Sequence, residues 1–197
     1  RGLGDVYKRQ AFGRTASGKT YTMQGEVASM QGEVASMQEE HTPETEDYGI
    51  SNFIYERRIP FHPLRFYDCL KREWPGVIRS KGVFWLATRL KTAGFWSQAG
   101  AVARHQCAGY FWAAVPRDHW PEDRSHIEKV WEDGNGDCRQ EIVLIGRGMD
   151  RKGLISMLDH CLLTEAELST DEQKWQNQFV DPFPEWEMDG DPVEIVF

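Results

Sequence analysis

The sequence predicts an α+β fold, a two-layer sandwich in which a mostly antiparallel sheet of four to five strands packs against two to three helices, with a disordered N-terminal leader. Hydrophobic residues make up 40% of the 197 residues and charged residues 27%, which is typical of a soluble globular chain. From His41 onward, apolar segments follow one another in the order β-α-β-β-β-α-β-α, which favours helices packed on an antiparallel or mixed sheet. All eight tryptophans lie at or after Trp74. We therefore place the folded core after residue 40.

The first half of this core alternates strand and helix signals. Residues 48–60 read as a strand, and Pro63 suits the first position of a helix, because the amide that proline lacks would be unpaired there. Residues 77–88 predict a central strand, since the continuous apolar run Val83–Leu86 indicates burial on both faces. Two further strands are expected over residues 94–104 and 107–115, around a turn at His105-Gln106.

The second half repeats the pattern. A helix is expected from Trp120, with Ser125 and Glu128 at capping-box spacing, and a strand over residues 139–145. Asp150 can cap the next helix, whose apolar stripe indicates a buried face. Thr164-x-x-Glu167 predicts one more short helical turn.

Bulky rings recur on neighbouring strands, in the pairs Phe84-Trp85 and Phe95-Trp96 and in the run 110–112. They would occupy both faces of the sheet, and one face must cover helices. The other face has two interpretations: a second helical layer or the tail covers it, or it stays exposed and docks another protein surface.

Residues 1–40 differ from the rest of the chain. A heptapeptide beginning at Met23 repeats at Met30, and one valine per copy cannot form a coiled-coil seam. The first ten residues resemble translated adapter sequence. We interpret residues 1–40 as a low-complexity leader, chimeric or artefactual, and exclude it from the fold prediction.

This leader contains a complete GxxxxGK[ST] motif, Gly13-Arg-Thr-Ala-Ser-Gly18-Lys19-Thr20. In such a loop backbone amides cradle phosphates, Lys19 would neutralise them and Thr20 would hold magnesium. Residues 11–25 resemble the ATP-binding loop of kinesin motors. A working loop follows a buried strand and opens a helix, whereas no continuous apolar run precedes this one and a glycine-containing repeat follows it. We expect the site to be non-functional, and ATP or GTP binding through it is the alternative function.

Charge and cysteine usage limit the classes of partner and the cellular compartment that we expect. The net charge is -8, and from Thr164 onward ten acidic residues face the single Lys174. This balance disfavours a nucleic-acid partner, and without eighteen consecutive apolar residues no membrane partner is expected. Four dispersed cysteines without a CxxC pair suit free thiols in a reducing compartment, so we expect a cytoplasmic location.

Several blocks, in the right order, resemble the CobW C-terminal domain over residues 41–187. They are residues 42–50, 59–66, 74–89, 95–100, 112–116, 120–123, 139–146 and 181–187. The family-motif positions that we single out are His62, Pro63, Arg65, Trp85, Trp96, Ser97 and Gly100. The expected organisation is a leader over 1–40, the CobW C-terminal domain over 41–187 and an acidic tail over 188–197.

The resemblance implies a non-catalytic interaction and regulatory domain of a GTP-dependent metallochaperone that handles zinc or cobalt. Its partners would be a GTPase domain or second subunit, and a client metalloprotein. The family's own GxxGxGKT loop and CxCC metal motif do not occur in this sequence. We therefore carry over no catalytic residue, and expect no cofactor in this chain, whereas the intact parent would use GTP, magnesium and zinc or cobalt.

Two remaining groups of residues have a structural and a chemical interpretation. His62, beside Pro63, fits a structural role at the start of its helix. His105 and Cys107 are two apart and would share one strand face, a spacing that could begin a transition-metal site. Two ligands do not make a site, so we predict no metal centre here.

Overall fold

The computed structural model describes residues 13–14, 20–21, 49–186 and 193–196. Its main sheet has six strands in the order β3-β7-β4-β5-β6-β8, all paired antiparallel. The strands are β3 (Ile50–Arg57), β4 (Val77–Trp85), β5 (Thr92–Ala99), β6 (Val102–Tyr110), β7 (Gln140–Arg147) and β8 (Val193–Val196). The predicted α+β class with an antiparallel sheet is confirmed.

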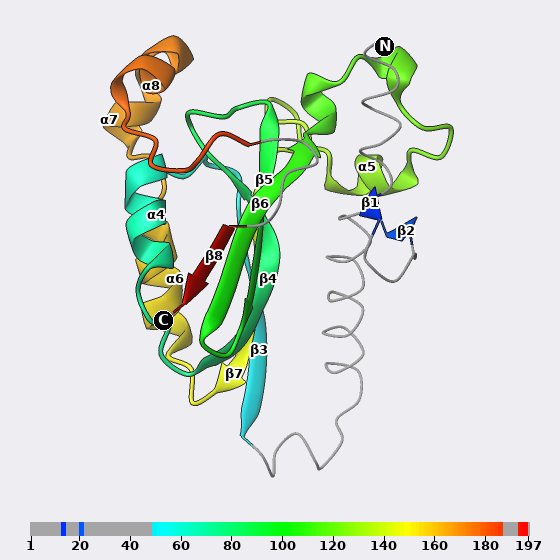
Figure 1. Ribbon diagram of the computed structural model, residues 1–197. Helices are drawn as coiled ribbons and strands as arrows, with labels where there is room; N and C mark the ends of the chain where they lie inside the picture. Colours follow the sequence, from blue (N-terminus) through cyan, green and yellow to red (C-terminus); the bar gives the residue numbers. More distant parts are fainter. Residues whose placement is uncertain (1–12, 15–19, 22–48, 187–192, 197) are drawn as a thin grey trace.

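Helices α4 (Pro63–Leu70) and α6 (Arg151–Asp159) lie along one face of this sheet, as Figure 1 shows. Two short helices, α7 (Glu165–Leu168) and α8 (Glu172–Gln178), follow at one end of this helical layer. The loop between β6 and β7 holds two 3-10 turns, η1 (Trp112–Ala114) and η2 (Arg117–His119), and helix α5 (Ser125–Val130). The expected element order is therefore present, with α8 and β8 added.

The core lies between the sheet and α4 and α6. Aromatic side chains dominate it, because Phe61, Phe66 and Phe84 are fully buried and Phe66 packs against both of the others. Trp74 stacks on Trp96 at 5.6 Å between ring centroids. Burying each such ring contributes about 2–3 kcal/mol relative to leaving it in water. This face of the sheet fixes the position of both long helices.

The predicted turn at His105-Gln106 is wrong. The β5–β6 hairpin turns at Gly100, where φ is 58°, a left-handed value that glycine adopts most easily. β6 runs straight through His105, which pairs with Trp96 of β5 and is 1% exposed. A polar histidine is typical of a turn, but the side chain of His105 lies on the buried face of β6.

The predicted capping box at Ser125 and Glu128 is also wrong. Arg124 occupies the N-cap position of α5 without a side-chain cap, and the amide of Ser125 donates to Asp123 instead. The other predicted caps are confirmed. Asp150 accepts a hydrogen bond from Gly153 at the start of α6, and Thr164 and Glu167 form a capping box on α7.

The aromatic strands do not form an exposed docking face. Phe84 and Trp96 are fully buried, while Trp85 and Phe95 are 8% and 7% exposed. Phe183, in the segment after α8, packs against Phe66 and Phe84 on the helical face. On the opposite face, Trp85 packs against Phe111 and Phe95 clusters with Val83 and Ala108, so neither ring is exposed for docking.

Strand β8 lies within the segment that the sequence predicts as an acidic tail. It pairs with β6 from Val102↔Val196 to His105↔Val193. Ile195 packs against the core. This part of the segment extends the sheet. The acidic residues around it favour a solvated tail, so the sequence pattern did not predict the strand.

Candidate functional site: the polar network at the start of α4

His62 begins the site by capping α4. Its Nδ1 accepts a hydrogen bond from the amide of Arg65 at 3.5 Å, and Pro63 occupies the first helical turn. Burial and the charge of Arg65 lower the pKa of His62. A neutral imidazole can accept this bond, so the structural role predicted for His62 fits its geometry.

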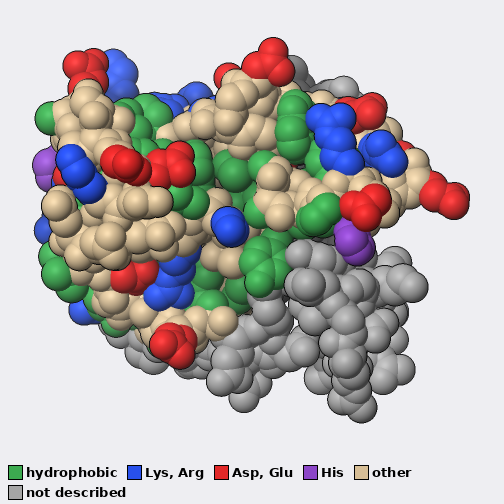
Figure 2. Space-filling model, turned by 90° about the horizontal axis from the view of Figure 1, so that it is seen from above, with side chains coloured by type: hydrophobic (Ala, Val, Ile, Leu, Met, Phe, Trp, Pro, Cys, Tyr) green, Lys and Arg blue, Asp and Glu red, His purple; other side chains and the backbone are tan. Residues whose placement is uncertain are grey.

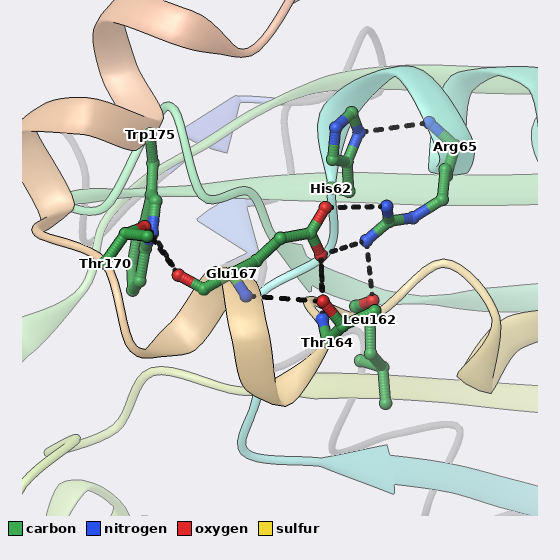
Figure 3. A network of polar contacts seen from close by, with 7 residues as sticks. All are labelled: His62, Arg65, Leu162, Thr164, Glu167, Thr170 and Trp175. Atoms are coloured by element: carbon green, nitrogen blue, oxygen red, sulfur yellow. Dashed lines mark hydrogen bonds and ion pairs between the residues drawn. The ribbon is translucent and has the colours of Figure 1, made fainter.

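Arg65 joins α4 to α7 through a bidentate ion pair, shown in Figure 3. Its Nη1 and Nη2 donate to the two carboxylate oxygens of Glu167 at 2.8 and 2.7 Å, and Nη2 also donates to the carbonyl of Leu162 at 2.9 Å. Glu167 also accepts bonds from the amide and hydroxyl of Thr164. The hydrogen bonds from Arg65 lower the pKa of Glu167 to about 2, so the carboxylate stays charged at neutral pH.

The same network holds α8. Trp175 is buried, and its indole N–H donates to the Thr170 hydroxyl at 2.8 Å and to the Glu167 carbonyl at 2.9 Å. The His62 ring lies 4.4 Å from the Phe179 ring, measured between centroids. Groups that are 117 residues apart in the chain therefore meet at one end of the helical layer. Most of their polar atoms make structural contacts, whereas the buried Nε of Arg65 has no hydrogen-bond partner.

The other family-motif residues have separate structural positions. Trp96 donates from its indole N–H to Ser80 at 2.7 Å within the core, whereas Trp85 lies against Phe111 and donates to the Leu90 carbonyl at 3.2 Å. Ser97 is half-buried in β5, and Gly100 forms the hairpin turn. These four positions do not converge with His62, Pro63 and Arg65 on a single site.

A second clamp was missed from sequence. Asp181 accepts from the Thr88 hydroxyl at 2.6 Å and from Arg89 Nε at 2.8 Å, and Arg89 lies 4.3 Å from the centre of the Trp186 ring. It fastens residues 181–186 over the core. The Asp-Pro-Phe-Pro-Glu-Trp block could have signalled a fixed turn, but its partner is more than ninety residues away.

His105 and Cys107 both lie on the buried face of β6. Both ring nitrogens of His105 are without a hydrogen-bond partner, and burial lowers its pKa to about 4. Burial raises the pKa of Cys107, which disfavours the thiolate that binds metal. Within residues 49–186 and the other described segments, no group of three or more His, Cys, Asp or Glu side chains could hold a metal ion.

The nucleotide motif of the leader lies largely outside the described residues. Gly13 belongs to β1 (Gly13–Arg14) and Thr20 to β2 (Thr20–Tyr21), which pair antiparallel with each other. Gly18 and Lys19 are not described. Nucleotide binding through this loop stays a prediction.

An open cavity of about 710 Å³ lies beside the network, where α4 passes the end of α6. Arg65, Arg72, Cys69, His160 and Cys161 contribute to its lining. Cys69 and Cys161 are buried, with 4% and 2% of their surface exposed. No local sequence pattern joins these two cysteines, because they belong to different helical segments.

The surface charges and the lengths of the helices bear on the predictions about nucleic-acid and membrane partners. On the face seen in Figure 2, acidic and basic side chains of the described residues are interspersed rather than gathered into a basic patch. Among the helices that the structure describes, none has the length and apolar character needed to cross a membrane. Fold and site together define an α+β domain whose prominent polar clusters join its own elements.

The chain belongs to the family of the cobalamin synthesis protein CobW C-terminal domain, whose model matches residues 50–162, more than half of the chain. It is 37% identical over 148 residues to zinc-regulated GTPase metalloprotein activator 1 of Dictyostelium discoideum, covering 72% of this chain and 31% of that protein. It is 28% identical over 151 residues to a zinc chaperone of Mycobacterium tuberculosis, covering 75% of this chain and 37% of that one.

The chain thus spans about a third of the length of these relatives. Among solved structures, it is similar to the Zn(II)-bound YjiA GTPase of E. coli, with a TM-score of 0.43 and 11% identity. That match covers 62% of this chain and 33% of the other. The family assignment rests on the sequence matches.

Proposed function

We propose that this chain is the non-catalytic interaction and regulatory domain of a GTP-dependent metallochaperone, and that it works in the cytoplasm. The family match over residues 50–162 carries this proposal. Two relatives are named as a zinc-regulated activator and a zinc chaperone, so zinc is favoured over cobalt as the metal. The partner is a GTPase domain of the same family, either in one polypeptide or as a second subunit.

The site supports a scaffold role. Arg65 and Glu167 form the ion pair beside His62. Each also binds backbone or hydroxyl groups of the chain. An acid–base catalyst must instead be able to reach a substrate atom and exchange a proton with it. The strongly lowered pKa of Glu167 also makes this carboxylate a poor proton donor near neutral pH.

A metal and nucleotide titration of the full chain tests the non-catalytic part of the proposal. We expect no zinc site tighter than micromolar, because the described residues hold no cluster of three metal-ligating side chains. We expect no GTP hydrolysis with magnesium, because the GxxGxGKT loop of the family does not occur in this sequence. A tight stoichiometric zinc site, or turnover of GTP, would contradict it. Lys19→Ala is the matched variant, since nucleotide binding that it abolishes would support the alternative function through Gly13–Thr20.

A client metalloprotein is the remaining partner of the proposal. Client recognition would depend on the assembled GTPase and C-terminal domains together. Capture of an apo-metalloenzyme by the assembled pair, and not by this chain alone, is the expected behaviour.

A further inference from the structure

Two thiols meet at the cavity beside the network. Cys69 lies near the end of α4 and Cys161 lies two residues beyond α6, and both belong to one buried cluster and line the same cavity. The Cys161 thiol is 3.4 Å from the Met157 carbonyl and 3.6 Å from the Arg65 carbonyl. Arg65 is one helical turn before Cys69, and helical side chains tilt towards the preceding turn. The two thiols are therefore neighbours beside the last turn of α4.

The surroundings make the two thiols unequal. The neighbouring Cys161 thiol and the positive charge of Arg72 lower the pKa of Cys69, although burial opposes them. The neighbouring Cys69 thiol and burial raise the pKa of Cys161. Cys69 is thus the sulfur that loses its proton more easily, and Cys161 keeps its proton beside it.

We propose that Cys69 and Cys161 form a site of reversible oxidation, at which hydrogen peroxide converts the two thiols into a disulfide. The cavity is the route for the oxidant, because both cysteines belong to its lining while only 4% and 2% of their surfaces are exposed. The described residues provide no third His, Cys, Asp or Glu that could complete a metal site with this pair. Oxidation therefore fits the pair better than metal chelation.

The chemistry proceeds in two steps. The Cys69 thiolate attacks one peroxide oxygen, the O–O bond breaks, and hydroxide leaves and is protonated to water. The resulting sulfenic acid is attacked by the Cys161 sulfur, the S–O bond breaks, and the Cys161 proton leaves with the oxygen as a second water. In total, two thiols and one hydrogen peroxide give one disulfide and two waters, with sulfur oxidised and peroxide oxygen reduced.

Peptide mapping of the reduced full chain after brief treatment with a small excess of hydrogen peroxide tests this site. After unfolding and alkylation without reductant, we expect one cross-linked peptide pair that contains Cys69 and Cys161, lighter than the sum of its parts by two hydrogens. Cys107 and Cys138 should be alkylated, and dithiothreitol should restore all four thiols. Cys138 is the matched control, because it is also buried and burial raises its pKa to about 12.

Alkylation of Cys69 and Cys161 to the same extent as Cys138 would overturn the proposal, as would oxidation of Cys69 to sulfinic acid without a cross-link. Cys161→Ala should leave Cys69 as a sulfenic acid that dimedone traps, whereas Cys138→Ala should cross-link as the parent does. Arg72→Met should slow the reaction several-fold and Arg117→Met, at an exposed site in η2, should not. Equal rates in these two variants would overturn the role of Cys69 as the attacking sulfur. None of these results depends on the proposed function in metal delivery.

Discussion

Glu167 serves two purposes at the scale of a single residue. Its carboxylate pairs with Arg65 of α4 and also caps α7 through the Thr164 amide and hydroxyl. The paired side chains are 27% and 23% exposed, so solvent screens their attraction only in part. The loss of this one group should loosen two elements at once.

We expect Glu167→Ala to lower the free energy of unfolding by about 2 kcal/mol, because a bidentate, charge-assisted pair and a helix cap disappear together. Glu165→Ala is the control. Glu165 is exposed in the first turn of the same helix, so its removal should change stability by less than about 0.5 kcal/mol. Urea unfolding of the two variants measures the difference, and equal losses would refute the clamp.

His105 is a buried residue that destabilises the fold. Because neither ring nitrogen has a hydrogen-bond partner, His105→Leu should raise the free energy of unfolding by about 1–2 kcal/mol at pH 7. The pKa of His105 is about 4 in the folded chain, below the ordinary 6.5 of an unfolded chain. Between these values the unfolded state binds the proton that the folded state excludes, so stability must fall as the pH falls.

The parent should therefore lose stability from pH 7 to pH 5, by up to about 1.4 kcal/mol per pH unit. His105→Leu should remove most of this slope and leave the smaller contribution of His62, whose pKa is also lowered. The lowered pKa of Glu167 acts in a separate window, where stability is lost only below about pH 4.5. Denaturant unfolding at several pH values tests this, and an unchanged slope in the variant would be inconsistent with a buried neutral His105.

At the scale of elements, the β4–β7 pair depends on one glycine. A β-carbon at Gly82 would lie 2.0 Å from the Glu141 carbonyl oxygen and 2.6 Å from the Ile142 α-carbon, and both are backbone atoms of β7. Gly100 differs, since a β-carbon there meets nothing within 4 Å and only its positive φ opposes a side chain.

Gly82→Ala should therefore cost more than about 3 kcal/mol and prevent normal folding, whereas Gly100→Ala should cost about 1 kcal/mol. Thermal unfolding, or the soluble yield where a variant does not fold, measures the contrast. Similar behaviour of the two variants would contradict the close β4–β7 packing.

Local patterns predicted the elements well. The apolar run Val83–Leu86 and the caps at Asp150 and Thr164 depend on neighbours in sequence, and all three are confirmed. Contacts between distant parts could not be predicted. Arg65 and Glu167 are 102 residues apart, and Cys69 and Cys161 are 92 apart, and nothing in their local sequence joins them. His105 was misread because burial of an unpaired polar ring contradicts the usual pattern.

At the scale of the whole molecule, the prominent polar clusters of the domain hold its own elements together. The network around Arg65 fastens α7 and α8 to α4, and the clamp at Asp181 fastens the following segment over the core. A domain held together in this way can respond to the nucleotide state of a bound GTPase through its packing, without taking part in GTP hydrolysis. The proposed function therefore requires this chain to bind a GTPase domain of the family.

The most direct test is isothermal titration of this chain into the isolated GTPase domain of the Dictyostelium relative, loaded in turn with GDP and with a non-hydrolysable GTP analogue. We predict 1:1 binding in at least one nucleotide state, with affinities that differ several-fold between the two states, because a regulatory domain must distinguish them. Absence of binding in both states, with both proteins shown to be folded, would contradict the account.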